Sequence, residues 1–524
     1  MTIPNQRSGL GRRHFLGLAG AGAGLVAVGA PALIASAQQL PDQLFTLGVA
    51  SGDPLPDGVV LWTRLAPEPT AADGHGGMPQ RKVPVQWQVS ENESFTRVVR
   101  SGAEVTTPEW GHSVHAEVHG LQPDREYWYR FRAGRELSPV GRTRTAPARA
   151  TDLSEMAFGF ASCSNFPNGY FTAYRHMAAD ELDLIVHLGD YIYEGAGAST
   201  IENRSHLPAA EIFSLADYRV RYSQYHTDVD LQAAHASAPW VVVPDDHEVE
   251  NNYADDISQI DDEPDQGREV FRQRRAAAYQ AYWENLPLRR SSMPKGPDMQ
   301  LYRRFDFGQL LGLHMIDTRQ YRSDQLERCV QDCDGRWDPT RSMLGAAQEK
   351  WLYDGLTTST TRWNVLGNQL ITFGLDNEDG PGVSYPMDNW NGYAGARQSL
   401  YTTVDQGGVE NFVVITGDAH RNTAAELKLD FKDPESTTIG AEFLGTSVSS
   451  GRDGNPRAVF DEDPDNLHIK FVNRSRGYQR VRVSKDQLQV DFRTMPYVTR
   501  PDAPIATLAT ATVESGRPGI ADIG

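Results

Sequence analysis

The chain of 524 residues has few cysteines and a deficit of positive charge, and each shortage excludes classes of protein. Its three cysteines are too few for a fold built on a disulfide framework. Its 69 acidic residues outnumber 50 lysines and arginines, which gives a net charge of −19. Nucleic acids and anionic membranes need a basic face, so we expect no nucleic-acid-binding module. The length predicts roughly two or three domains.

Residues 1–37 have the pattern of an export signal. Two arginines at 12–13 precede a stretch rich in Ala, Gly and Leu at 16–34, and small residues follow at 35–37. This twin-arginine pattern predicts passage through the twin-arginine export machinery, and hence a secreted, periplasmic or cell-surface protein. A membrane anchor is the alternative. We expect no stable transmembrane anchor, because the stretch is richer in Gly and Ala than in Leu and Ile.

Residues 40–147 are predicted to form a β-sandwich. Stretches at 59–64, 83–89 and 126–132 alternate in polarity or are rich in β-forming residues, and breaks with Pro and Gly separate them. The segment 121–127 resembles a tyrosine-corner turn. A length of roughly 100 residues suits a sandwich of the immunoglobulin or fibronectin type III kind.

Residues 152–500 are predicted to form an α/β domain. Buried strands expected at 156–161 and 184–188 flank a helical segment at 169–180, which is βαβ order and favours a parallel sheet. Residues 501–524 are rich in Ala, Pro and Gly, and we expect them to form a loose C-terminal tail.

Several predicted strands end in side chains that can bind a metal. These are Cys163, Asp190, Asp246, Asn368, Asp418 and His420. One such residue alone is an ordinary turn former, and Cys163 alone is most simply a buried hydrophobe. Donors at five strand ends of one domain favour a shared site instead. Carboxylate and amide oxygens suit Ca²⁺, Mg²⁺ or Mn²⁺, whereas the thiolate of Cys163 with the phenolate of Tyr193 suits Fe³⁺.

Three motifs at these strand ends resemble those of the PhoD-type alkaline phosphatases, a branch of the calcineurin-like metallophosphatases. They are Gly-Asp-Tyr-Ile-Tyr-Glu at 189–194, Asp-Asp-His-Glu-Val at 245–249 and Gly-Asp-Ala-His at 417–420. The segments 48–54 and 60–64 resemble the N-terminal domain of that family. The resemblance covers nearly all of residues 40–500. It implies an N-terminal β-sandwich followed by a four-layer αββα catalytic domain.

The resemblance also implies a centre that holds one Fe³⁺ and Ca²⁺ ions. The implied metal ligands are Cys163, Asp190, Tyr193, Asp246, Asn368, Asp418 and His420. Cys163 and Tyr193 would bind iron, and Asp190 would bridge metals. His247 would contact the transferring phosphoryl group. Arg319 would either clamp phosphate or form an ion pair inside the fold.

These features predict an exported, metal-dependent alkaline phosphatase that hydrolyses phosphate monoesters and also diesters. A secreted phospholipase D-like phosphodiesterase is the alternative, because some extracellular phospholipases resemble this family. An exported binding protein without enzymatic activity is a further alternative. We expect a monomer.

Cys329 and Cys333 are separated by three residues, Val-Gln-Asp. In an exported protein this spacing favours a local disulfide, with two free thiols as the alternative.

Overall fold

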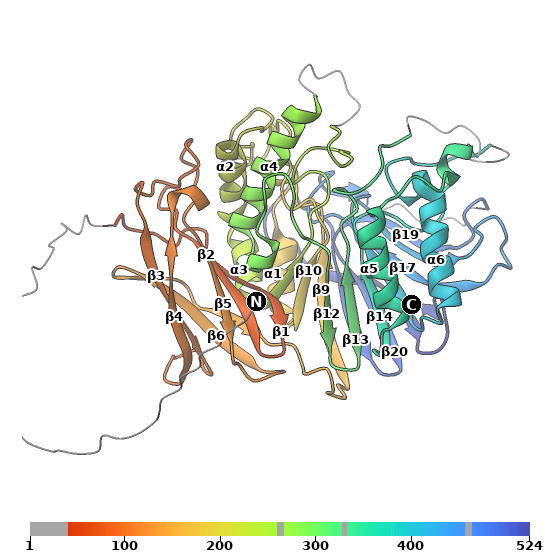
Figure 1. The fold of residues 1–524 in the computed structure, drawn as a ribbon, viewed down its shortest axis with the longest axis horizontal. Helices are drawn as coiled ribbons and strands as arrows, with labels where there is room; N and C mark the ends of the chain where they lie inside the picture. The colour runs from red at the N-terminus through yellow and green to blue at the C-terminus, as the bar shows by residue number, and fades with distance from the viewer. Residues whose placement is uncertain (1–39, 259–266, 327–332, 379, 381, 456–463) are drawn as a thin grey trace, which may run out of the picture. The chain divides into compact units, whose positions relative to one another are not determined.

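Two β-sheets packed face to face form the centre of the computed structural model (Figure 1). The structure describes residues 40–524 except 259–266, 327–332, 379, 381 and 456–463. The expected export signal therefore lies outside the described residues. The long strand β19 (Ile469–Ser484) pairs with strands of both sheets and joins them.

The first sheet runs from the N-terminal region to the C-terminus. In spatial order it contains β5 (Ser113–His119), β2 (Gly58–Arg64), β1 (Val49–Leu55), β11 (Pro239–Val242), β10 (Leu184–His187), β9 (Glu155–Ala161), β19, β20 (Gln487–Met495), β21 (Ala506–Glu514) and β22 (Asp522–Ile523). Strands β9, β10 and β11 are mutually parallel, so their carboxyl ends lie at one edge.

The second sheet also contains a row of parallel strands. In spatial order it contains β12 (Arg303–Phe307), β13 (Leu311–Met315), β14 (Trp363–Gly367), β15 (Phe412–Thr416), β17 (Thr438–Leu444), β16 (Asn422–Lys428) and β19, with β18 (Gly454–Asn455) paired to β19. Strands β13, β14, β15 and β17 are parallel neighbours. Each sheet therefore presents a row of parallel strand ends.

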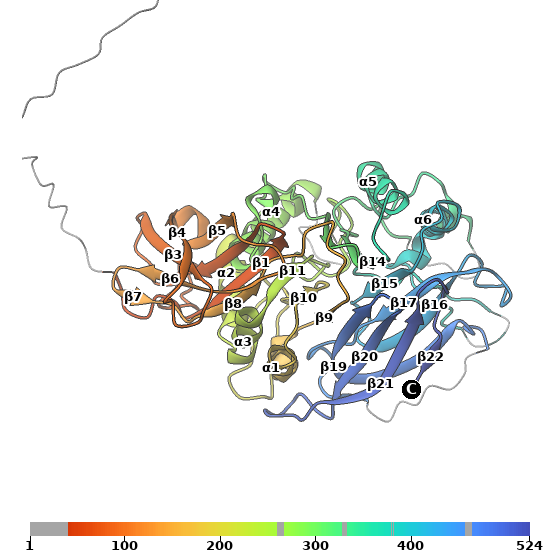
Figure 2. The ribbon, with the colours of Figure 1, turned by 90° about the horizontal axis from the view of Figure 1, so that it is seen from below.

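Alternating side chains divide the core into layers. Leu184 and Val186 of β10 face the core between the sheets, whereas Ile185 faces a second core against helices. The helices packed on the first sheet are α1 (Thr172–Ala179), α2 (Leu215–His226), α3 (Val229–Ser237) and α4 (Arg268–Asn285). Those packed on the second are α5 (Gly345–Thr357) and α6 (Ala394–Gln406). Figures 1 and 2 show these flanking helices, and the predicted αββα layers are confirmed.

The N-terminal region is a sandwich that shares a sheet with the catalytic layers. Its outer sheet contains β4 (Val98–Thr106), β3 (Val83–Ser90), β6 (Glu126–Ala133), β7 (Glu136–Leu137) and β8 (Gly141–Arg144). These strands pack on β1, β2 and β5 through a common apolar core. Gln122 N donates to Tyr127 Oη at 2.9 Å, as a tyrosine corner requires. Because β1 pairs with β11, residues 40–524 form one compact unit.

The expected loose tail at 501–524 is wrong. Residues Ala506–Glu514 form β21, which pairs antiparallel with β20, and Asp522–Ile523 extends the sheet as β22. Ala511 and Val513 belong to the core between the sheets. Alanine is depleted in strands, so the alanines of this segment weaken its strand signal, and the partner strand decides the conformation.

Two of the three cysteines lie within the described residues. Cys163 is free and buried, and Cys333 is disulfide-bonded, although Cys329 lies outside the described residues.

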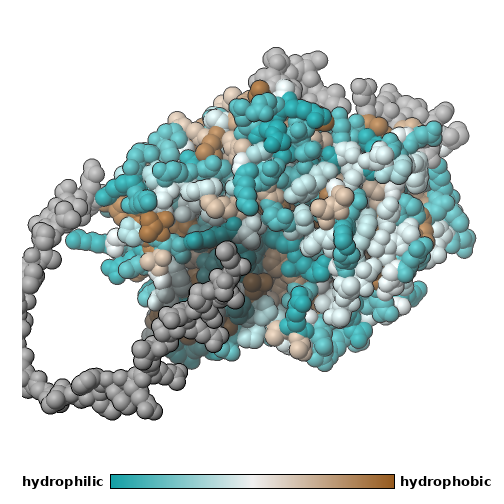
Figure 3. Space-filling model, in the orientation of Figure 1, coloured by the Kyte–Doolittle hydropathy of each residue, from teal (hydrophilic) through white to brown (hydrophobic). Residues whose placement is uncertain are grey.

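Over the described parts of the chain, no helix has both the length and the apolar character needed to cross a bilayer. The face in Figure 3 is mainly hydrophilic, with scattered apolar residues.

Two substitutions on β21 distinguish a core strand from a tail. Val513→Asp should lower the free energy of unfolding by about 3–5 kcal/mol, because it buries an uncompensated charge. Leu508→Asp on the same strand is the control, since Leu508 is 47% exposed, and should change stability by about 0.5 kcal/mol or less. Urea unfolding measures both. Equal effects of the two variants would contradict a packed C-terminal strand.

Candidate metal centre

The predicted donors follow the carboxyl ends of parallel strands in both sheets. Cys163 follows β9, Asp190 follows β10, Asp246 follows β11, Asn368 follows β14, and Asp418 and His420 follow β15. The two rows of strand ends therefore deliver side chains to one region between the sheets. This is the edge where α/β sheets usually bind ligands.

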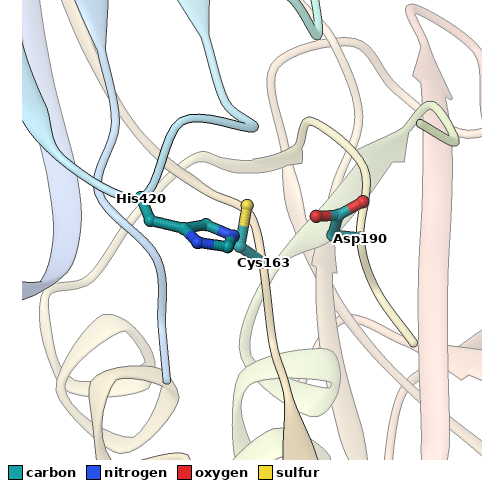
Figure 4. A group of neighbouring side chains, drawn as sticks. All are labelled: Cys163, Asp190 and His420. Carbon is teal, nitrogen blue, oxygen red and sulfur yellow. The ribbon is translucent and has the colours of Figure 1, made fainter. Parts of the chain in front are cut away.

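Cys163, Asp190 and His420 form the first group of donors, shown in Figure 4. One ligand atom of each residue lies within 4.8 Å of the others. The thiol lies between the imidazole and the carboxylate (Figure 4). Tyr193 adjoins this group, because its hydroxyl donates to Asp190 Oδ2 at 2.8 Å and lies 3.1 Å from His420 Nε2.

Two further groups extend the first. Asp190, Asp246 and His247 form one, and Asp245, Asp246 and Asp418 form the other, each with ligand atoms within 4.8 Å. Asp190 and Asp246 are shared between groups, so the donors form one continuous cluster. A shared carboxylate is the arrangement needed to bridge neighbouring cations.

The backbone at four of these donors is left-handed. The φ angles are 62° at Cys163, 55° at Asp190, 67° at Asp418 and 54° at His420. Residues with side chains adopt this region at a cost of about 1–3 kcal/mol each, and such residues concentrate at functional sites. The surrounding structure therefore imposes these conformations and aims the side chains inward.

Glu248 holds two donor loops against each other. Its carboxylate accepts Asp190 N at 3.1 Å, Tyr191 N at 2.5 Å and Asp245 N at 2.8 Å. The loops approach so closely that a Cβ at Gly189 would lie 2.3 Å from that of Asp245. Glycine is required at 189 for this contact and for its φ of 99°.

His247 lies beside the cluster and is oriented by Glu194. Its Nδ1 lies 2.7 Å from Glu194 Oε2, and its ring packs on that of Tyr193 with centroids 4.1 Å apart. Burial opposes protonation, but the carboxylates of Glu194 and Asp190 raise the pKa of His247 well above its ordinary value. A protonated imidazole here can donate a hydrogen bond to an anion.

Arg319 forms ion pairs inside the fold, which is the second of its two predicted roles. Its Nε lies 2.6 Å from Asp245 Oδ1, its Nη1 lies 3.0 Å from Asp388 Oδ1, and its Nη2 lies 3.4 Å from Asp246 Oδ2. The side chain is fully buried. Arg319 therefore neutralises and positions acids of the cluster.

Asn368 is buried, but its hydrogen bonds stay within its surroundings on the second sheet. Its Nδ2 donates to the carbonyl of Leu370, and its Oδ1 accepts the Trp390 indole at 3.4 Å. These contacts do not connect it to the three groups of donors. Its role as a ligand stays a prediction.

The donor cluster has the properties expected of a cation site. Asp190 Oδ1 and Asp245 Oδ2 are buried without a hydrogen-bond partner. Burial raises the pKa of Asp190, Cys163 and Asp418 well above their ordinary values, and neighbouring acids raise all three further. Buried acids that lack partners cost free energy unless a cation neutralises them. Oxygen, nitrogen and sulfur donors together fit both hard and transition metals.

Glu194, Glu248 and Asp388 had no role predicted from the sequence. Glu194 and Glu248 stand inside two of the quoted motifs, so their positions carried a usable signal. Asp388 lies in a loop and contacts Arg319 and Arg322. Nothing in its local sequence separates it from an ordinary surface acid.

Comparison with known proteins places this geometry in a family. Residues 158–492 match the PhoD-like phosphatase family, and residues 30–147 match the PhoD-like phosphatase N-terminal domain. Alkaline phosphatase D of Bacillus subtilis (strain 168) is 47% identical over 483 residues, which cover 91% of this chain and 82% of that protein.

Solved structures agree with the sequence relatives. A structure of PhoD superposes with a TM-score of 0.86 at 48% identity, covering 91% of each chain. A purple acid phosphatase from yellow lupin (Lupinus luteus) seeds has a TM-score of 0.53 at 13% identity, over 90% of this chain and 74% of that one, and shares the fold. The chain therefore belongs to the PhoD-like phosphatase family and is a phosphoric ester hydrolase.

Proposed function

We propose that this phosphatase is an exported, metal-dependent alkaline phosphatase that hydrolyses phosphate monoesters and diesters. The supporting observation is the continuous cluster of donors in three overlapping groups. It joins a thiol and a phenol to several carboxylates at the strand ends of both sheets. Alkaline phosphatase D, the relative from Bacillus subtilis, supports the reaction class.

The proposed metals are Fe³⁺ and Ca²⁺. Cys163 and Tyr193 would hold the iron, since thiolate and phenolate are electron-rich anions. Asp190 would bridge the metals, because two donor groups share it. Asp246, Asp418 and His420 complete the proposed ligand set, with Asn368 predicted from its position alone. When bound, the metals supply Lewis acidity that draws charge from the phosphate oxygens.

The residues around the metals have separate roles in this proposal. His247 donates a hydrogen bond to the phosphoryl group or to the leaving oxygen, and Glu194 holds its ring in place. Arg319 acts as a positioning residue, because its guanidinium is engaged by carboxylates. Export through the twin-arginine route rests on residues 1–37.

Removal of the shared carboxylate should stop turnover. Asp190→Asn is expected to reduce kcat with p-nitrophenyl phosphate by more than roughly 100-fold, because even neighbours that orient a ligand contribute about 10–100-fold. Elemental analysis of the same preparation should show reduced metal content. The control is Asp405→Asn, an exposed residue on α6. Full activity with full metal content in Asp190→Asn would refute the assignment.

The Glu194 contact should affect catalysis more than substrate binding. Glu194→Gln weakens the hold on His247 Nδ1, so kcat should fall at least roughly tenfold with little change in KM. The control is Glu202→Gln, which changes an exposed residue in the same loop region. It should leave kcat and KM unaltered. Steady-state kinetics on p-nitrophenyl phosphate measure the pair. Equal kcat values for the two variants would show that Glu194 does not position a catalytic group.

A substrate panel separates the proposed function from the phospholipase D-like alternative. We expect hydrolysis of p-nitrophenyl phosphate and bis-p-nitrophenyl phosphate, and negligible release of choline from phosphatidylcholine. Chromogenic assays and choline detection compare the three substrates at equal concentration. Faster choline release than nitrophenol release would favour the phosphodiesterase.

A further inference from the structure

Four arginines surround the point where β19 passes from the second sheet to the first. Arg421 directly follows His420, Arg452 lies two residues before β18, and Arg474 and Arg476 lie on β19. We call these four residues the arginine rim. Its position follows from the strand pairing, because β19 leaves β16 and joins β9 at the carboxyl ends of the parallel strands. The rim therefore borders the metal centre.

Arg476 attaches the rim to the metal centre. Its Nη1 donates to His420 O at 2.6 Å, its Nε to Arg452 O at 3.0 Å, and its Nη2 to Gly451 O at 3.2 Å. The side chain is buried and its guanidinium is satisfied by carbonyls. Arg476 therefore acts as a scaffold and leaves binding to the other three arginines.

The other rim arginines have no carboxylate within 4.0 Å among the described residues. Arg421 Nε is buried without a hydrogen-bond partner. Arg452 Nη2 donates to Thr200 Oγ1 at 3.2 Å. The adjacent acid, Asp453, gives its carboxylate to Val498 and Thr499 instead. The rim thus carries positive charge that the described fold does not neutralise.

Strand register adds a cost to this arrangement. Asn422, the first residue of β16, pairs with Asn473 of β19, so Arg421 and Arg474 flank the end of this ladder. Arg474 itself pairs with Asn455 of β18. Like charges held close to the same strand end repel each other. This repulsion opposes folding, whereas an anionic ligand bound by both guanidiniums would offset it.

The positive charge of the arginine rim contrasts with the net negative charge of the whole chain. A net charge of −19 repels anionic substrates, so a substrate with several negative groups needs a local positive surface. Guanidinium groups bind phosphate and carboxylate through paired hydrogen bonds. The metal centre accommodates the phosphate that is cleaved, and the rim lies beside it.

We propose that Arg421, Arg452 and Arg474 form a second anion subsite, which selects phosphate esters that carry another phosphate or similar anion next to the scissile one. This inference rests on the proposed phosphatase function and specifies its substrate class. It distinguishes polyanionic substrates from simple monoesters with neutral leaving groups.

Paired synthetic substrates test the subsite. We compare kcat/KM for butane-1,4-diol bisphosphate with that for butane-1,4-diol monophosphate, and repeat the comparison with the hexane-1,6-diol pair. The wild-type ratio should be roughly tenfold or more, because each 1.4 kcal/mol of extra binding gives about a factor of ten. In the Arg421→Gln, Arg474→Gln double variant the ratio should fall toward about two, the statistical factor for two equivalent phosphates. Arg135→Gln, which removes one positive charge from the turn between β6 and β7, should retain the wild-type ratio.

The outcomes separate the subsite from the proposed function. A wild-type ratio near two for both diols would overturn the subsite and leave the phosphatase intact. Equal proportional losses for monophosphate and bisphosphate in the double variant would also overturn it, because the arginines would then act on the cleaved phosphate or on folding. Thermal unfolding midpoints of all variants identify a folding defect. Wild-type protein that hydrolyses neither ester, nor p-nitrophenyl phosphate, would refute the proposed function itself.

Discussion

Repulsion among buried acids is the constraint on which the rest of the site depends. Asp190, Asp245 and Asp246 are buried and lie together with the half-buried Asp418, and an uncompensated buried charge costs several kcal/mol. Arg319 offsets part of this cost through its contacts with Asp245 and Asp246. The unpartnered oxygens of Asp190 and Asp245 remain for cations. The same concentration of charge that opposes folding of the empty site favours metal binding.

The two-sheet core makes this concentration possible. Val186 of β10 and Val365 of β14 belong to one apolar core between the sheets, which holds the two rows of strand ends in fixed relation. Loops from both rows are then forced into left-handed conformations at Cys163 and Asp418. Strain of this kind persists because the packed strands on either side over-determine the loop.

The N-terminal sandwich contributes to the same framework. Arg64 of β2 donates to Ser223 Oγ on α2 at 2.9 Å and to Asn285 Oδ1 at the end of α4 at 3.0 Å. Trp62 Nε1 donates to Glu284 O at 2.9 Å. Together with the pairing of β1 and β11, these contacts connect the sandwich to the helices that cover the first sheet. The region is therefore a structural part of the catalytic unit.

The sequence by itself determined the features that depend on neighbouring residues. Buried strands followed by donors, and the short spacing from Asp190 to Tyr193, predicted a parallel α/β sheet and much of the candidate cluster, because strand direction and local motifs are encoded within a few residues. The four αββα layers were implied by the family resemblance. The tertiary structure decided what depends on distant partners. Arg319 became an internal ion pair because Asp245 and Asp388 approach it from other loops. Residues 506–514 became a strand because β20 supplies the pairing, and Arg421 lies near the end of the ladder that contains Arg474 because β19 crosses between the sheets. Such contacts join segments far apart in the chain, and no local pattern records them.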